Sequence, residues 1–187
     1  MSQFEITIAH QGWLAGVTPE EDLCSHGGIR LRISGIAITT GAEDYGISES
    51  ALALLRTLAS DRVRGDALAE VMIFHGCGAM LMGGCSLGVD WTTRHVAERV
   101  LISDVVRYDG AGGTDAHFFP DAIADLPFGE YASAVIPFAR AARALFEGVS
   151  KTVKESEFAP GAYSAFWREY DDLLVRYGHG TLIPLAV

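Results

Sequence analysis

The run from Ser86 to Tyr108 constrains the fold more than any other part of the sequence. Apolar and polar residues alternate on both sides of Ala97 and Glu98, and a period of two is typical of strands that bury one face. If Ala97 and Glu98 form a two-residue turn, Val96 pairs with Arg99 and the two runs stay in phase along their length. We therefore expect an antiparallel hairpin with one buried and one solvated face.

This register divides the side chains of the hairpin between two faces. The apolar face comprises Leu87, Val89, Trp91, Val100, Ile102, Val106 and Tyr108. The polar face comprises Asp90, Thr92, Arg94, Arg99, Ser103 and Arg107. Asp104 breaks the pattern, because its carboxylate falls on the apolar face opposite Trp91. A buried carboxylate needs a partner or its pKa rises. We therefore expect a general acid or ligand contact, a structural hydrogen bond, or a bulge that turns Asp104 outward.

Other patterns predict further strands and three helices. Strands are expected at 4–12, at 29–33 and 36–38 around a bulge or tight turn at Gly35, at 71–74, and at 118–126 as an edge strand with Pro120. Helices are expected from a cap at Ser48 to Ala59, from Glu130 to Gly148 with a kink or a broken first turn at Pro137, and from Ala162 to Tyr177. The third helix has an aromatic face formed by Phe166, Trp167, Tyr170 and Tyr177.

Strands dominate the earlier part of the chain and helices its end. This segregation predicts an α+β fold in which helices pack over one side of a mainly antiparallel sheet of about five to six strands. Two of the three helices are C-terminal. At 187 residues the chain is long enough for a sizeable core but short for two domains, so we expect a single domain over residues 1–187.

The formal net charge is −10 at pH 7. A surface of this sign lacks the cations that replace counterions on nucleic acid, which argues against a nucleic-acid partner. It favours a basic protein partner through electrostatic steering, although many cytosolic proteins are acidic for solubility alone. No apolar run is long enough to cross a bilayer, and the first ten residues lack the basic and apolar regions of a secretory signal. We expect a cytoplasmic protein with no membrane partner.

Three cysteines, Cys24, Cys77 and Cys85, are an odd number in a chain without an export signal, so we expect reduced thiols. His75, Cys77 and Cys85, with His95 further on, offer soft ligands that suit zinc. Their spacing differs from the paired C-x2-C and H-x3-H spacings of zinc sites, and free cysteines are commonly small buried residues. The sequence therefore predicts no metal and no cofactor.

The sequence contains no established catalytic motif. Cys24 and His26 offer a nucleophile and a base, but side chains two apart in an extended segment point the same way without necessarily meeting. The GAGG run at residues 110–113 lacks the strand-to-helix context and the third glycine of a dinucleotide-binding fingerprint. No G-x-S-x-G, H-E-x-x-H or phosphate-binding G-x-x-x-x-G-K-[ST] motif is present.

Three segments resemble a group of small uncharacterised bacterial proteins: ALALLRTLASD at 51–61, GGCSLGVDWTTRH at 83–95 and VLISDVVRYD at 100–109. They lie in the middle of the chain and look like helix and hairpin packing, so the resemblance implies no catalytic residues. Some small, acidic, single-domain α+β proteins of bacteria are immunity proteins that neutralise toxins. The resemblance implies such a role by analogy of fold alone.

The first functional hypothesis is a non-enzymatic, acidic binding protein, with an immunity or inhibitor role as its most specific form. Its docking surface would be the exposed row of Asp90, Thr92, Arg94 and Arg107, in which Asp90 and Arg107 lie within reach of a surface ion pair. The aromatic third helix offers further anchors for a partner. The alternative for the row is a helix that covers this face and makes the row a buried polar layer.

The second hypothesis is a small hydrolase or isomerase with a His, Cys and Asp site around residues 75–104. Its candidate catalytic residues are Asp104, His95 and Cys77. Convergence of these side chains in one pocket would favour the enzyme, and their separation would favour the binding protein. The oligomeric state, including a homo-oligomer, stays open.

Overall fold

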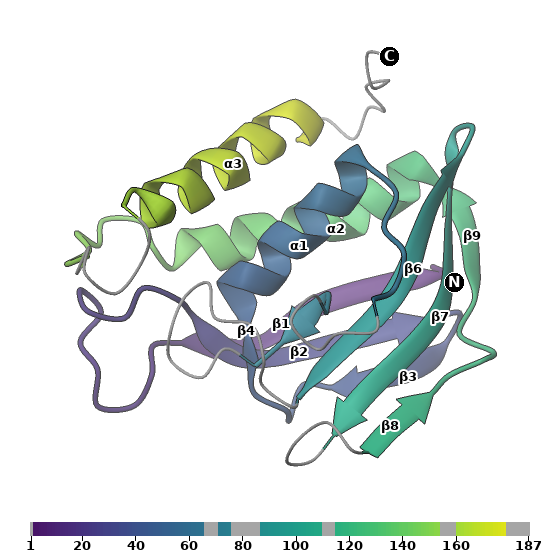
Figure 1. The fold of residues 1–187 in the computed structure, drawn as a ribbon, viewed down its shortest axis with the longest axis horizontal. Coiled ribbons are helices and arrows are strands. Elements are labelled where there is room, and N and C mark those ends of the chain that lie inside the picture. Colours follow the sequence, from purple (N-terminus) through teal and green to yellow (C-terminus); the bar gives the residue numbers. More distant parts are fainter. Residues whose placement is uncertain (1, 66–70, 76–86, 110–114, 154–159, 179–187) are drawn as a thin grey trace.

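The structure is a computed structural model that describes residues 2–65, 71–75, 87–109, 115–153 and 160–178. Figure 1 shows the helices gathered on one side of the molecule and the strands on the other. The strands are β1 (Phe4–Gly12), β2 (His26–Ile33), β3 (Ile36–Thr40), β4 (Tyr45–Gly46), β5 (Ile73–Phe74), β6 (Gly88–Val96), β7 (Arg99–Asp109), β8 (Asp115–Phe118) and β9 (Ala124–Pro127). The helices are α1 (Ile47–Ala59), α2 (Phe128–Ala144) and α3 (Ala162–Tyr177).

The strands form two antiparallel sheets. Sheet A has the order β1-β2-β3, with β4 also paired to β2. Sheet B has the order β5-β6-β7-β8, with β9 also paired to β7. The predicted α+β class, antiparallel pairing and two C-terminal helices are confirmed. The strands are divided between two sheets rather than gathered in one. β5 confirms the short strand predicted at 71–74, although only Ile73 and Phe74 belong to it, whereas β4 is too short to show any alternation in the sequence.

One hydrophobic cluster includes residues from both sheets and all three helices. The ring of Trp91 in β6 is fully buried and lies 6.2 Å from the ring of Phe4 in β1. Phe4 in turn lies 5.0 Å from the ring of Tyr131 in α2. These contacts join sheet B to sheet A and sheet A to the helices. The buried side of β6 and β7 therefore faces the rest of the molecule.

The hairpin of β6 and β7 follows the predicted register from the turn as far as Thr92 and Ser103. Beyond that point the register shifts by one residue, so that Asp90 pairs with Val106 rather than with Val105. The extra residue is Asp104, whose φ of 57° lies in the left-handed region. Aspartate tolerates this conformation better than most residues do. A β-bulge therefore lies in the middle of β7, which confirms one of the three alternatives predicted for Asp104.

The turn between β2 and β3 absorbs the phase slip that the sequence shows at Gly35. Ser34 and Gly35 form a two-residue connection with φ values of 49° and 81°. Two successive positive φ values are characteristic of the type I′ turn, whose twist matches that of antiparallel strands. The predicted tight turn is thus confirmed. It keeps Ile33 and Ile36 opposite one another.

The N-cap of helix α1 lies two residues before the predicted cap. Gly46 is the N-cap residue, and Ser48 lies inside the first turn of the helix. The Ser48 hydroxyl accepts a hydrogen bond from the backbone N–H of Ser25 at 3.0 Å and donates one to Glu49 at 2.6 Å. The prediction of Ser48 as cap is wrong because this hydroxyl bonds to a distant loop and to its neighbour. The start of α1 is thereby tied to the segment before β2.

The predicted edge strand at 118–126 is two separate strands. β8 pairs with the second half of β7, and β9 pairs with its first half. The chain turns between them at residues 119–123, and Pro120 lies in this turn. Proline lacks the N–H that a strand needs for its ladder, which explains why pairing stops here.

Helices α2 and α3 cover the core from the other side. The predicted bounds of α3 are confirmed, whereas α2 begins at Phe128 and ends at Ala144, before Gly148. Pro137 lies at an exposed position within α2, and the helix continues through it to Ala144. Among the described residues, no helix is long and apolar enough to cross a membrane.

Candidate functional site

The predicted docking row does not form one exposed surface. Asp90 and Thr92 are buried, whereas Arg94 is exposed. These two residues are covered by the extended segment that follows α1, and not by a helix. In this segment Arg62 forms an isolated antiparallel bridge with Thr93 of β6. The expectation of an exposed row is therefore wrong for Asp90 and Thr92.

The segment after α1 also provides partners for the buried polar groups. The backbone N–H of Arg64 donates to the Thr92 hydroxyl at 3.1 Å, and that of Gly65 donates to the Asp90 carboxylate at 3.2 Å. The Arg62 guanidinium donates to both Asp90 and the carbonyl of Trp91. Burial raises the pKa of Asp90 against the opposing effect of these hydrogen bonds. Asp90 is thus a structural carboxylate.

Arg107 lies on the other side of sheet B because the bulge reverses the phase of β7. It pairs with Val89 and donates a hydrogen bond to the carbonyl of Ile38 in sheet A at 2.8 Å. Its ion-pair partner is Asp109, at 2.9 Å. The predicted surface pair between Asp90 and Arg107 does not form.

Asp104 points outward, as expected if a bulge turns it away from the apolar face. It is exposed, and the Ser103 hydroxyl donates a hydrogen bond to it at 2.9 Å. Hydrogen bonding from Thr92, and then from Ser103, lowers the pKa of the Asp104 carboxyl. A carboxyl with a lowered pKa is a poor general acid at neutral pH.

His95, the other candidate catalytic residue that the structure describes, does not converge with Asp104. His95 lies on the core side of β6, with its ring 6.0 Å from that of Phe128, and pairs with Asp61 at 3.1 Å. His75 lies 3.7 Å from Asp44 at the end of β5. Cys77 and Cys85 lie outside the described residues. The described part of the predicted His, Cys and Asp site is therefore scattered.

The aromatic face of α3 is committed to the core. Phe166, Tyr170 and Tyr177 are all buried, and the Tyr170 hydroxyl donates to the carbonyl of Ala139 in α2 at 2.7 Å. The expectation that these rings anchor a partner is wrong, because α3 uses them to pack on its own chain.

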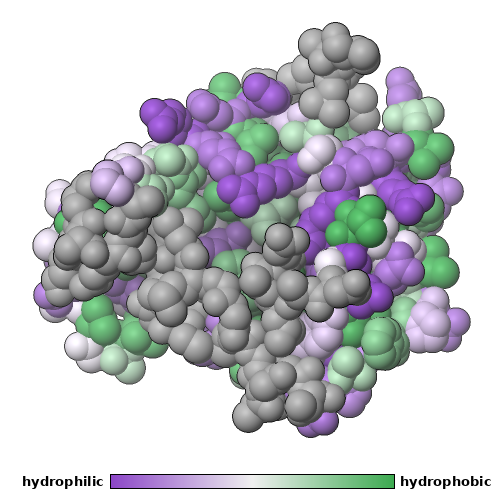
Figure 2. All heavy atoms as spheres, in the orientation of Figure 1, coloured by the Kyte–Doolittle hydropathy of each residue, from purple (hydrophilic) through white to green (hydrophobic). Residues whose placement is uncertain are grey.

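The side of sheet B that faces away from the core, its outer face, remains exposed at several positions. Val96 shares this face with Arg94. Phe118 lies on the same face opposite Val106, which in turn lies opposite Asp90. The exposed residues of the outer face include Arg94, Val96, Arg99, Asp104, Phe118 and Asp125. In Figure 2 hydrophobic residues are scattered among hydrophilic ones over β6, β7 and β8.

The structure brings together a second group that the sequence analysis set aside. The side chains of Asp22, Cys24 and His26 are all buried, and their ligand atoms lie within 4.8 Å of one another. His26 Nε2 lies 3.6 Å from Cys24 Sγ and 3.6 Å from Asp22 Oδ1. The sequence signal was the alternation of Asp, Cys and His at every second position. It was missed because alternation alone does not show that the side chains meet.

A fourth side chain reaches this group from α1. Glu49 is buried in the first turn of α1, and its carboxylate lies close enough to interact with the thiol of Cys24. We refer to Asp22, Cys24, His26 and Glu49 as the buried cluster. No local pattern in the sequence links Glu49 to the others, because the contact depends on how α1 docks against the segment before β2.

The electrostatics of the buried cluster argue against nucleophilic catalysis. Burial, with the nearby charges of Glu49 and Asp22, raises the pKa of the Cys24 thiol far above its ordinary value. Burial likewise raises the pKa of Glu49, although the hydrogen bond from Ser48 opposes it. The hydrogen bond to Asp22 raises the pKa of His26. A protonated thiol is a weak nucleophile, so Cys24 and His26 do not form an activated pair.

Burial opposes ionisation of Asp22, but hydrogen bonds outweigh it and lower its pKa. The donors are His26 and the backbone N–H groups of Leu14 at 2.6 Å and Cys24 at 3.2 Å. Asp22 is therefore a carboxylate held in one orientation by the loop around it.

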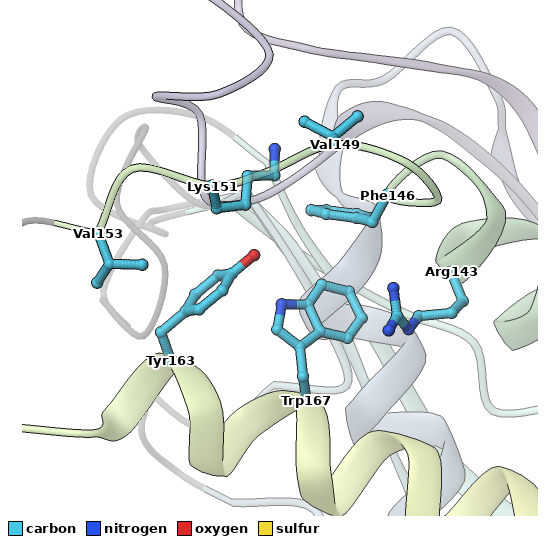
Figure 3. Close-up of a pocket in the computed structure, with 7 residues that line it drawn as sticks. All are labelled: Arg143, Phe146, Val149, Lys151, Val153, Tyr163 and Trp167. Carbon is cyan, nitrogen blue, oxygen red and sulfur yellow. The ribbon is translucent and has the colours of Figure 1, made fainter.

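A pocket of about 310 Å³ lies where the segment after α2 meets α3. Figure 3 shows Tyr163 and Trp167 of α3 facing Phe146 and Lys151. The Lys151 ammonium donates to the carbonyls of Pro19 and Asp22, and Arg143 pairs with Asp171 at 3.0 Å. Both cations of the pocket are engaged by the protein, so we assign it no ligand.

Comparison with models of protein families, with curated proteins and with solved structures gave no match.

Proposed function

We propose that this chain is a non-enzymatic, acidic, cytosolic binding protein that docks a basic partner protein on the outer face of sheet B. An immunity or inhibitor protein of a bacterium is the most specific form of the proposal. The scatter of the described catalytic candidates supports a binding role over a hydrolase or isomerase.

The observation that carries the proposal is the exposure of large hydrophobic side chains on this face. Phe118 is 64% exposed and Val96 58%. Each lies among charged or polar residues, and the guanidinium of Arg64 lies 5.9 Å from the centre of the Phe118 ring. Aromatic residues next to arginine are the kind of group that contributes most to protein interfaces.

The charge of the chain defines the class of partner. A net charge of −10 attracts a basic protein over long distances and raises its association rate, whereas the apolar groups of the outer face supply the short-range contacts. An acidic inhibitor that meets a basic toxin is one arrangement of this type.

The test compares Phe118→Asp with a matched control, Val175→Asp. Val175 is 78% exposed on α3, away from sheet B, so both substitutions place a carboxylate on an exposed apolar position. Each tagged protein is used to capture partners from a lysate of the source organism at low salt. We expect a basic protein to be captured by the native chain and by Val175→Asp, and to be lost with Phe118→Asp.

Raising the salt concentration to about 1 M, where the Debye length is about 3 Å, should weaken capture by the native chain. Equal capture by all three proteins would overturn the docking face. Capture of an acidic partner would also overturn the proposal. A failure to capture any protein would overturn the binding role.

A further inference from the structure

Three residues of the buried cluster, Asp22, Cys24 and His26, have ligand atoms close enough together to hold a metal ion. Tetrahedral bonds of zinc to sulfur, nitrogen and oxygen place two ligand atoms about 3.4–3.6 Å apart. In the structure, His26 Nε2 lies 3.6 Å from Cys24 Sγ and 3.6 Å from Asp22 Oδ1. All three ligand atoms lie within 4.8 Å of one another. A small ion could therefore reach all three with little movement of the chain.

The backbone holds these side chains in place. Two backbone N–H groups, of Leu14 and Cys24, donate to the two carboxylate oxygens of Asp22. His26 is the first residue of β2 and pairs with both Gly12 of β1 and Gly46 of β4. Supporting hydrogen bonds of this kind orient the ligands of metal sites.

Glu49 provides a second and independent observation. Its side chain is about nineteen-twentieths buried, at 5% exposure, and Oε1 accepts no hydrogen bond of ordinary geometry from the described residues. The other oxygen accepts the hydrogen bond of Ser48. An oxygen left without a donor in the interior is costly unless a cation or a proton compensates it. The Glu49 carboxylate interacts with the thiol of Cys24, so Glu49 lies next to the three-ligand group.

We infer that Asp22, Cys24, His26 and Glu49 form a binding site for a divalent transition-metal ion of the zinc class. One sulfur, one imidazole nitrogen and two carboxylate oxygens match the mixed ligands of zinc and differ from the all-oxygen sets of calcium and magnesium. Four protein ligands in a buried position leave no open position for substrate. The ion is therefore structural.

The position of the site indicates what the ion would join. Asp22 and Cys24 belong to the loop before β2, whereas Glu49 belongs to α1. Ser25 already links the two, because its carbonyl accepts from the N–H of Ile47 at 2.7 Å and its own N–H donates to Ser48. The ion would add a coordinate link at the same junction, and it would stabilise the docking of α1 on sheet A.

The experiment uses Co²⁺ as a spectroscopic probe and Zn²⁺ as its competitor. The full chain carries Cys77→Ser and Cys85→Ser, so that Cys24 is its only thiol, and is freed of metal with a chelator. We expect one equivalent of Co²⁺ to give the charge-transfer absorption of a thiolate ligand together with tetrahedral visible bands. One equivalent of Zn²⁺ should then abolish both and raise the melting temperature. Absence of the thiolate band in the folded protein would overturn the site.

Two further variants locate the ion in the protein. Glu49→Gln preserves size and removes one ligand charge, so it should weaken Co²⁺ binding by at least about tenfold. His95→Gln removes a histidine that pairs with Asp61 away from the cluster, and it should leave the affinity unchanged. Circular dichroism of each variant reports whether it is folded. Equal affinity of the native chain and a folded Glu49→Gln protein would exclude Glu49 from the site, and with it the four-ligand proposal.

Discussion

The carboxylate of Asp90, which is completely buried, accepts a hydrogen bond from the guanidinium of Arg62 at the edge of β6. Arg62 lies in the segment that crosses from α1 toward β5, and it also bonds to the carbonyl of Trp91 at 2.9 Å. A surface that the sequence presents as a row of solvated charges is in part a covered polar layer. The pair thus determines which residues of the outer face a partner can touch.

Arg62→Ala should destabilise the fold by about 3 kcal/mol, because it leaves Asp90 buried without its cation. The additional substitution Asp90→Asn removes the uncompensated charge, so the double variant should be more stable than Arg62→Ala alone. Urea unfolding of the two single variants and the double variant gives the coupling between the residues. Additive costs would show that the two side chains do not act as a pair.

Trp91→Ala should cost about 3–5 kcal/mol, through lost burial and the cavity left between the two sheets. The indole Nε1 of Trp91 has no hydrogen-bond partner among the described residues. Trp91→Phe therefore loses apolar contacts but no hydrogen bond, and it should cost less than half as much. Both values follow from chemical denaturation. A cost below about 1 kcal/mol for Trp91→Ala would contradict its place in the core.

The bulge can be tested at Asp104 itself. Its φ of 57° is strained for a β-branched residue and free of strain for glycine. Because the side chain is exposed, Asp104→Gly should change the stability by no more than about 0.5 kcal/mol. Asp104→Val should lower it by about 1–2 kcal/mol. Equal effects of the two substitutions in thermal melts would mean that residue 104 has an ordinary strand conformation.

The lowered pKa of Asp104 also predicts a dependence of stability on pH. A carboxyl whose pKa is lower in the folded than in the unfolded chain stabilises the fold above its unfolded pKa of about 3.9. That contribution is lost as the pH falls through the folded pKa. Asparagine tolerates the same backbone conformation, so Asp104→Asn removes the charge without disturbing the bulge.

Unfolding free energies of the native chain and of Asp104→Asn should therefore differ at pH 6 and approach one another as the pH is lowered below about 3.9. A difference that stays constant over this range would show that the ionised carboxylate of Asp104 makes no contribution.

The spacing of apolar residues predicts a helix or strand where that element buries one of its faces. The bounds of α3 and the hairpin next to its turn follow from the spacing of Tyr170, Tyr177, Val100 and Ile102. The bulge at Asp104 follows from the sequence only as one of three alternatives, because strict alternation and a one-residue shift bury equally apolar residues, Val106 or Val105.

The buried cluster and the cover of β6 have a different origin. Glu49 and Arg62 act on residues that are distant in sequence, and their positions depend on the docking of α1 and of the segment that follows it. The periodicity of apolar residues in the sequence does not indicate such contacts. The every-second-residue spacing of Asp22, Cys24 and His26 is visible in the sequence, but only the fold shows that the three side chains point into the interior.

The bulge also separates β7 into two lengths with different neighbours on the same edge. Residues 99–102 pair with β9, whose alternate side chains are buried, whereas residues 106–109 pair with β8, whose four residues are all exposed. Detaching β8 breaks one short ladder and uncovers little apolar surface. The amide hydrogens of β8 should therefore exchange with deuterated solvent through local opening. Those of β9 should exchange only through a larger unfolding event.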